Sequence, residues 1–91
     1  MTNDDPCRAP PTRVTVTGRV VRLRLRPDGG WRIHLAQTGG ALAVGDIGPS
    51  NPLPLPRVGA CILLRGALRY DETHRWYAID PVDAWVEPRE A

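Results

Sequence analysis

The sequence predicts a small all-β domain that closes into a five-stranded barrel. Apolar and polar residues alternate with the two-residue period of a β-strand, most clearly from Arg13 to Leu35. This alternation slips by one position at Val20–Val21, close to Gly18, and such a slip is typical of a β-bulge that bends a strand. No stretch has the periodicity of a helix of three turns or more. A long first strand with a bend in its middle is what a small closed barrel requires.

The first two expected strands form a hairpin. In strand Arg13–Leu25 one face is apolar, and this face is built from Val14, Val16, Gly18 and Val20 before the slip and from Val21, Leu23 and Leu25 after it. The opposite face carries Arg22, Arg24 and Arg26. Turn-forming residues occupy 27–30. The second strand, Trp31–Ala36, is expected to point Trp31, Ile33 and Leu35 inward and Arg32 and His34 outward.

The third expected strand, Ala41–Ile47, is short and follows a turn at 37–40. Its apolar side is expected to hold Leu42 and Val44. Four prolines between positions 48 and 59 exclude a regular helix in the next connection and favour an extended chain. Leu53, Leu55 and Val58 are expected to lie across one end of the barrel, whereas exposure of the same proline-rich segment would suit a protein partner.

The fourth expected strand, Ala60–Tyr70, is the most apolar one, and alternate residues from Ile62 to Tyr70 are expected to share its inward face. We also expect Cys61 to be buried and Gly66 to allow a second sharp bend. A turn at 71–74 leads to strand Arg75–Ile79, which Asp80–Asp83 should end before a short extended piece at 84–86. Residues 1–12 are interpreted as a flexible leader, 13–87 as the barrel domain and 88–91 as a polar tail.

Composition places bounds on the class of protein. The 91 residues contain no run of 18 apolar residues, and the first 12 lack the apolar segment of a signal peptide, so we expect a cytoplasmic protein without a membrane span. Cys7 and Cys61 are the only cysteines, and the sequence leaves open whether they pair. All twelve basic residues are arginine, and six of them lie between 13 and 35, whereas six acids lie between 70 and 91.

Several of these features together resemble an oligonucleotide/oligosaccharide-binding (OB) fold. They are the bend at Gly18, the loop between the first two strands, Gly59 before the fourth strand, and the run Gly66–Asp71. The resemblance covers roughly residues 13–86 and implies a five-stranded Greek-key barrel that binds ligands with its second and third strands and with its 1–2 and 4–5 loops. In this fold the connection between strands three and four often holds a helix, but here it is proline-rich.

A narrower resemblance lies in the pattern Tyr70-Asp71-x-x-His74-x-Trp76-x-x-Ile79-Asp80-Pro81-Val82. It is similar to the end of small bacterial OB-like domains that carry an Asp-x-x-His turn followed by Glu-Ile-His-Pro-Val. The present chain differs at two polar positions, since Ala78 replaces the glutamate and Asp80 replaces the histidine. The narrower resemblance therefore implies the fold rather than a shared polar site.

The resemblance and the arginines predict a binding face for single-stranded DNA or RNA. Proteins of this kind combine a cationic groove with rings on which bases stack. The expected contact residues are Arg22, Arg24, Arg26, Trp31, Arg32, His34, Arg69, His74, Arg75 and Trp76. Two alternatives remain open: that the arginines only solvate exposed strands, and that the tryptophans fill the core of a chain that has no phenylalanine.

Other functions find less support. Asp71, His74, Asp80 and Asp83, with His34, lack the spacing of a metal site, so we expect no metal and no cofactor. Neither Ser50 nor Cys7 lies near a histidine in sequence, so no catalytic residue is expected and the protein is not predicted to be an enzyme. The alternative function is a non-catalytic module for protein–protein interaction or self-association, in which the basic and acidic parts of the chain pair between copies.

Overall fold

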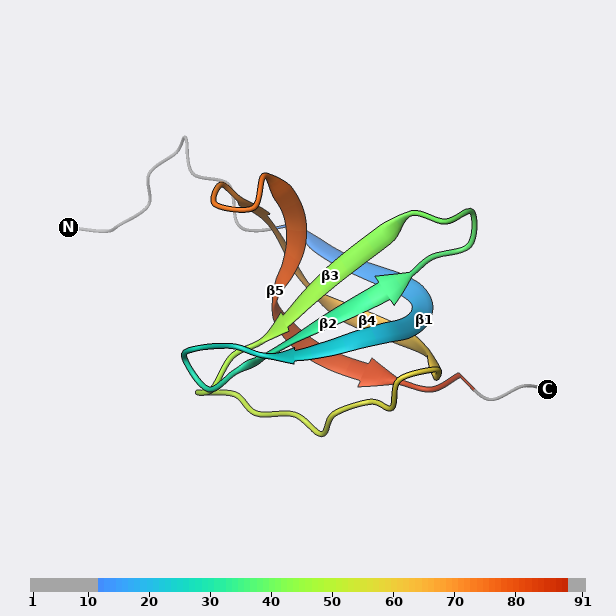
Figure 1. The fold of residues 1–91 in the computed structure, drawn as a ribbon, viewed down its shortest axis with the longest axis horizontal. Helices are drawn as coiled ribbons and strands as arrows, with labels where there is room; N and C mark the ends of the chain where they lie inside the picture. The colour runs from blue at the N-terminus through green and yellow to red at the C-terminus, as the bar shows by residue number, and fades with distance from the viewer. Residues whose placement is uncertain (1–11, 89–91) are drawn as a thin grey trace.

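The computed structural model describes residues 12–88 and shows an all-β domain (Figure 1). Its five strands are β1 (Arg13–Leu25), β2 (Trp31–Ala36), β3 (Leu42–Ile47), β4 (Cys61–Asp71) and β5 (Trp76–Val86). They form one closed barrel, and no helix occurs between residues 12 and 88. The predicted fold class is therefore confirmed. In this part of the chain, no helix has the length and apolar character needed to cross a membrane.

The order of strands around the barrel is β1-β2-β3-β5-β4, and β4 returns to β1. All neighbouring strands are antiparallel except β3 and β5, which run parallel and are paired only at Gly45 and Ile79. Beyond this one point the two strands separate, and the β4–β5 hairpin rises away from β3 (Figure 1).

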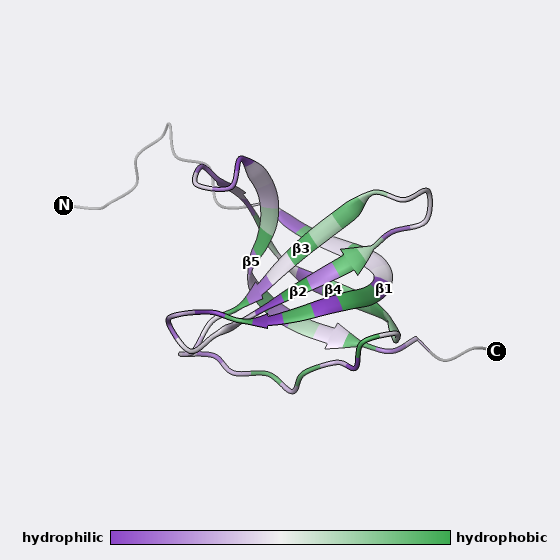
Figure 2. Cartoon of the chain, in the orientation of Figure 1, coloured by the Kyte–Doolittle hydropathy of each residue, from purple (hydrophilic) through white to green (hydrophobic). Residues whose placement is uncertain are grey.

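The bend in β1 lies where the sequence predicts it. Val20 pairs with Leu35 and Arg22 pairs with His34, so Val21 is the additional residue of a bulge and is exposed. The bend lets β1 pair with β4 through its first half and with β2 through its second half. Figure 2 shows hydrophobic and hydrophilic residues alternating along the second half of β1. The expectation that Val21 continues the inward face is wrong, because the bulge turns this residue outward.

Gly66 permits a second irregularity, between β4 and β5. A Cβ atom at this position would collide with the carbonyl oxygen of Pro81 and the side chain of Ile79, so only glycine allows the two strands this close approach. The pairing shifts on both sides of Gly66, and these bulges accommodate Pro81 within β5. The expected end of the fifth strand at Asp80–Asp83 is therefore wrong, since β5 continues through it.

The same irregularity changes which side chains of β4 point inward. Ile62 and Leu64 are buried as expected, but beyond Gly66 it is Ala67 that is buried, whereas Leu68 and Tyr70 are exposed. The expectation of a single inward face from Ile62 to Tyr70 is wrong for this outer part of the strand. The outer part of β4 extends beyond the barrel into the β4–β5 hairpin (Figure 1).

Residues from all five strands form one hydrophobic core. Its fully buried side chains are Val20, Ile33, Leu35, Ile47, Ile62, Leu64, Ile79 and Val82. The inward side of β3 differs from the prediction. Ala43 packs against the core opposite Leu35, whereas Leu42 is exposed. A Cβ atom at Gly45 would press against Val82 and Leu64, so this point of the barrel interior has no room for a side chain. Val44 is buried as expected, although it lies opposite the outward-facing His34.

The connection between β3 and β4 packs on the barrel without forming a helix or a strand. Leu53 packs against the core, and the indole N–H of Trp85 donates a hydrogen bond to the carbonyl oxygen of Pro54 at 2.6 Å. Leu55 and Val58 are exposed. Of the three residues expected to cover the barrel end, only Leu53 packs against the core.

Cys61 is exposed, so the expectation that it is buried is wrong. Because Ile62 points into the core, the preceding residue must point outward from the strand. Cys7, the other cysteine of the pair considered above, lies outside the described residues, as does nearly all of the expected leader.

Candidate functional site

A pocket of about 400 Å³ lies on the outer surface of β1 and β2, between the β1–β2 loop and the turn that joins β4 to β5. We call it the groove. It is lined by Arg24, Leu25, Arg26, Pro27, Arg32, His34, His74 and Trp76. The structure thus brings together six of the ten residues that the sequence predicts for binding. The groove combines guanidinium groups with aromatic rings and two apolar side chains.

The pairing of β1, β2 and β3 explains why these side chains share one face. Arg22 lies opposite His34, and Arg24 lies opposite Arg32, across the β1–β2 ladder. Across the β2–β3 ladder, Arg32 lies opposite Asp46. Residues directly opposite one another in antiparallel strands point to the same side of the sheet. Ile33 and Leu35 point into the core, so their neighbours Arg32 and His34 point outward. The residues paired with Arg32 and His34 therefore lie on the outer surface as well.

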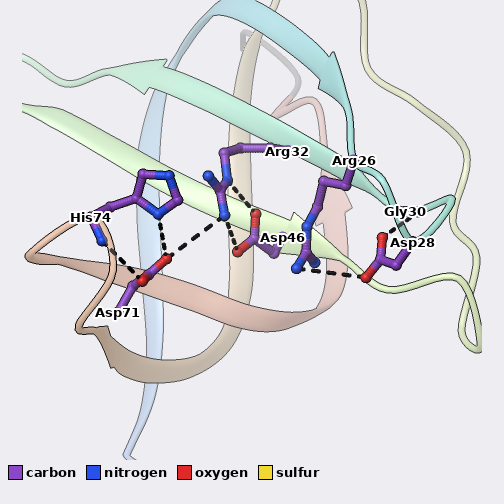
Figure 3. A network of polar contacts seen from close by, with 7 residues as sticks. All are labelled: Arg26, Asp28, Gly30, Arg32, Asp46, Asp71 and His74. Atoms are coloured by element: carbon purple, nitrogen blue, oxygen red, sulfur yellow. Dashed lines mark hydrogen bonds and ion pairs between the residues drawn. The ribbon is translucent and has the colours of Figure 1, made fainter.

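Arg32 is bound by a buried carboxylate. Its Nε and Nη2 atoms donate hydrogen bonds to the two oxygens of Asp46, at 2.8 and 3.2 Å, and Asp46 is only 2% exposed (Figure 3). The hydrogen bond to Asp46 raises the pKa of Arg32 above its ordinary value. Arg32 Nη2 also lies 3.8 Å from Asp71. The charge of Arg32 is thus balanced within the protein, and this arginine holds the site together instead of offering a free cation.

The turn between β4 and β5 is organised by Asp71. Its Oδ1 atom accepts hydrogen bonds from the backbone N–H groups of Thr73 at 2.9 Å and His74 at 3.2 Å, and its Oδ2 lies 2.9 Å from His74 Nδ1 (Figure 3). The bond to the His74 ring, followed by the backbone bonds, lowers the pKa of Asp71. A carboxylate with these partners shapes the turn and fixes the histidine ring.

Three rings meet at the base of this turn. The rings of His74 and Trp76 are stacked, with centroids 4.7 Å apart and planes within 9°. The edge of His34 approaches Trp76 at 6.3 Å, and the guanidinium carbon of Arg32 lies 5.5 Å from the centroid of the Trp76 ring. Trp76 is therefore enclosed by neighbours from β2 and from the turn.

The free positive charge of the site lies on β1. Arg22 and Arg24 are exposed and form no ion pair with any residue from 12 to 88. Arg26 lies 3.6 Å from Asp28, whose other oxygen accepts a hydrogen bond from the Gly30 N–H at 2.8 Å. Arg22 and Arg24 are therefore the arginines best placed to attract an anion.

The other four predicted residues, Arg22, Trp31, Arg69 and Arg75, are not among those that line the groove. Arg22 lies on the same face of β1 as Arg24 but further from the β1–β2 loop. Trp31 is half-buried and packs against the core, so its ring fills volume at the start of β2. Arg69 is exposed on β4, where its charge acts on Asp80. Arg75 is exposed in the turn and has a φ of 57°.

The surroundings of His34 disfavour its protonated form. Burial lowers the pKa of this histidine, and the positive charges of Arg22, Arg32 and Arg24 lower it further, with a small opposing effect from Asp46. The Nε2 atom of His34 and the indole nitrogen of Trp76 are both buried and have no partner among the described residues. On β5, burial and the nearby Asp46 raise the pKa of Asp80.

The lowered pKa of His34 predicts a loss of stability in mild acid. Below the ordinary value of 6.5, the unfolded chain binds a proton that the folded chain resists, so the free energy of unfolding falls as the pH drops through this value. Urea unfolding midpoints between about pH 7.5 and 5.5 should fall further for the wild type than for His34→Gln, which cannot titrate. Parallel profiles for the two proteins would show that His34 does not contribute.

The acidic residues and histidines near the groove meet only in small groups. Asp71 and His74 contact each other, but in the described range no three His, Cys, Asp or Glu side chains converge. The fold and the site together define a small five-stranded barrel with a cationic groove lined by rings. No model of a known protein family matches this chain. A comparison with curated proteins finds no match either.

Proposed function

We propose that this protein is a non-catalytic module of the OB type that binds single-stranded DNA or RNA in the groove. The order of its strands and the parallel closure of β3 on β5 are consistent with an OB-like barrel. Barrels of that type bind ligands with strands two and three and with the 1–2 and 4–5 loops. The groove occupies this position, because β2, the β1–β2 loop and the β4–β5 turn all contribute to it.

The observation that carries the proposal is that free Arg24 and the stacked rings line one groove, with free Arg22 on the same strand face beside it. Arg22 and Arg24 alternate on one strand face, so their Cα atoms lie roughly 6.7 Å apart, a separation that suits successive phosphates of an extended strand. The His74–Trp76 stack lies across the groove from this cationic edge. Cations for phosphates and rings for bases are the two elements that single-strand binding requires.

The arrangement of charges around the groove supports an anionic ligand. Arg24 lies directly opposite Arg32, and like charges in this position destabilise a sheet. Asp46 and Asp71 compensate Arg32, but neither Arg22 nor Arg24 has a carboxylate partner in the described structure. Bound phosphates would supply the missing negative charge. Bases of a duplex are paired and stacked within the helix, so only a single strand presents them to the rings.

Fluorescence anisotropy with labelled oligonucleotides tests this function. Single-stranded DNA and RNA of about 12 nucleotides fall within the site size of one OB barrel, and the matching duplex serves as the control. We expect saturable binding of a single strand at micromolar protein and low salt, with weaker binding of the duplex. Absence of single-strand binding under these conditions would refute the proposed function.

A further inference from the structure

His74, rather than Trp76, has the ring surface that is open to a ligand. Stacking at 4.7 Å covers one face of each ring, and Trp76 is further enclosed by Arg32 and by the edge of His34. The His74 side chain remains 44% exposed, whereas Trp76 is half-buried. The tryptophan therefore serves as a support, and the histidine forms the outer layer of the stack.

The His74 ring is also held in place before any ligand arrives. Asp71 binds both its backbone N–H and its Nδ1 atom, and the same carboxylate lies 3.8 Å from Arg32. Arg32 is in turn fixed by its two hydrogen bonds to the buried Asp46 on β3. A continuous series of polar contacts thus connects the barrel wall to the turn (Figure 3). A ring that is already ordered loses little conformational entropy when a ligand stacks on it.

The opposite side of the groove is suited to the same ligand. Leu25 is 64% exposed although it is apolar, and it lines the groove together with Pro27. Arg24 lies beside Leu25 on β1. A volume of about 400 Å³ lies near the lower end of the range for small-molecule sites, so it suits one nucleotide better than a stacked run of bases.

We propose that the groove takes up one base at a time, stacked on the open face of His74, while Arg22 and Arg24 bind the neighbouring phosphates. This inference rests on the proposed function and specifies its ligand as a single unstacked nucleotide within a strand. Base stacking tolerates every base, because each one has an aromatic face. The site therefore distinguishes a strand that has bases from one that lacks them, and does so with little preference for sequence.

Two substitutions separate a stacking role of His74 from a role in shaping the turn. His74→Phe keeps a ring and loses the contact with Asp71, whereas His74→Gln keeps an amide that can bind Asp71 and loses the ring. We expect His74→Gln to weaken single-strand binding about tenfold and His74→Phe to stay within about twofold of the wild type. A reversed order, equal losses, or no loss in either variant would overturn the stacking role.

An oligonucleotide with abasic sites provides a second test that needs no variant. The wild type should bind this strand about tenfold more weakly than the intact strand, because the phosphates remain while the stacking is lost. His74→Gln should bind both strands equally. Equal binding of both strands by the wild type would contradict the inference but leave the proposed function standing, whereas the proposed function fails only if the intact strand does not bind.

Discussion

Replacement of Asp46 by alanine is expected to lower the free energy of unfolding by about 3 kcal/mol, since it removes both hydrogen bonds of the largely buried Arg32 guanidinium and leaves only Asp71, 3.8 Å away, to balance its charge. Asp46 is 2% exposed, and its partner Arg32 has a side chain that is 14% exposed. A loss of this size is a large fraction of the stability of a small domain. Urea or thermal unfolding at neutral pH measures it.

A double replacement provides the control for this result. Arg32→Met together with Asp46→Leu removes both charges and fills a similar volume, so the double variant should recover most of the stability that Asp46→Ala loses. If Asp46→Ala instead lost less than about 1 kcal/mol, the pair would behave like an exposed salt bridge and would not anchor the site.

Replacement of both Arg22 and Arg24 by alanine is expected to weaken single-strand binding roughly 30-fold at low salt. This value corresponds to about 1 kcal/mol for each lost phosphate contact. The fold should not suffer, because neither arginine has an ion-pair partner in the described structure and the loss of Arg24 relieves its repulsion with Arg32. Anisotropy measures the affinity, and thermal unfolding confirms that the variant is folded.

Arg65 offers a matched control for this experiment. It is also an exposed strand arginine without an ion-pair partner among residues 12–88, but it lies on β4 and lines a different pocket. Arg65→Ala should bind single strands within about twofold of the wild type. An equal loss of affinity in Arg65→Ala and in the double variant would show that the whole surface attracts the ligand and that the groove has no special role.

The sequence predicts the architecture well because strand alternation and glycine positions are local signals. The slip at Val20–Val21 locates the bulge, and the bounds of β1 and β2 agree with the prediction. The bounds of the fifth strand are not predicted correctly, because a proline such as Pro81 by itself suggests that the strand ends there. Only the bulged pairing around Gly66 in the neighbouring strand shows how β5 continues, and this pairing depends on residues far apart in sequence.

The hydrophobicity of its residues alone does not predict which side chains of β3 point into the core. Leu42 is a large apolar residue of this strand, but it is 68% exposed, and the smaller Ala43 packs against the core in register with Leu35. At Gly45, Leu64 and Val82 leave no room for a side chain. Free volume in the core depends on the whole fold. The exposure of Cys61, in contrast, follows from the alternation itself once Ile62 is placed in the core.

The sequence predicts many of the residues that line the candidate site, but it does not predict which of its residues contact one another. Six of the expected residues line the groove, yet Asp46 is missed, and Arg32 is predicted only as a contact for the ligand. A single aspartate within the apolar run 42–47 is the one signal that suggests a buried acid in need of a partner. The stacking of His74 on Trp76 depends on the conformation of the turn, which the spacing of the two residues does not determine.

The dependence of binding on salt tests the central claim most directly. Each phosphate that a protein neutralises on a single strand contributes about −0.7 to the slope of log K against log salt concentration. If Arg22 and Arg24 each bind one phosphate of a strand that occupies the groove, the slope for the wild type should be steeper than that for the double alanine variant by about 1.4. Identical slopes for the two proteins, or wild-type binding that does not weaken with salt, would contradict the account.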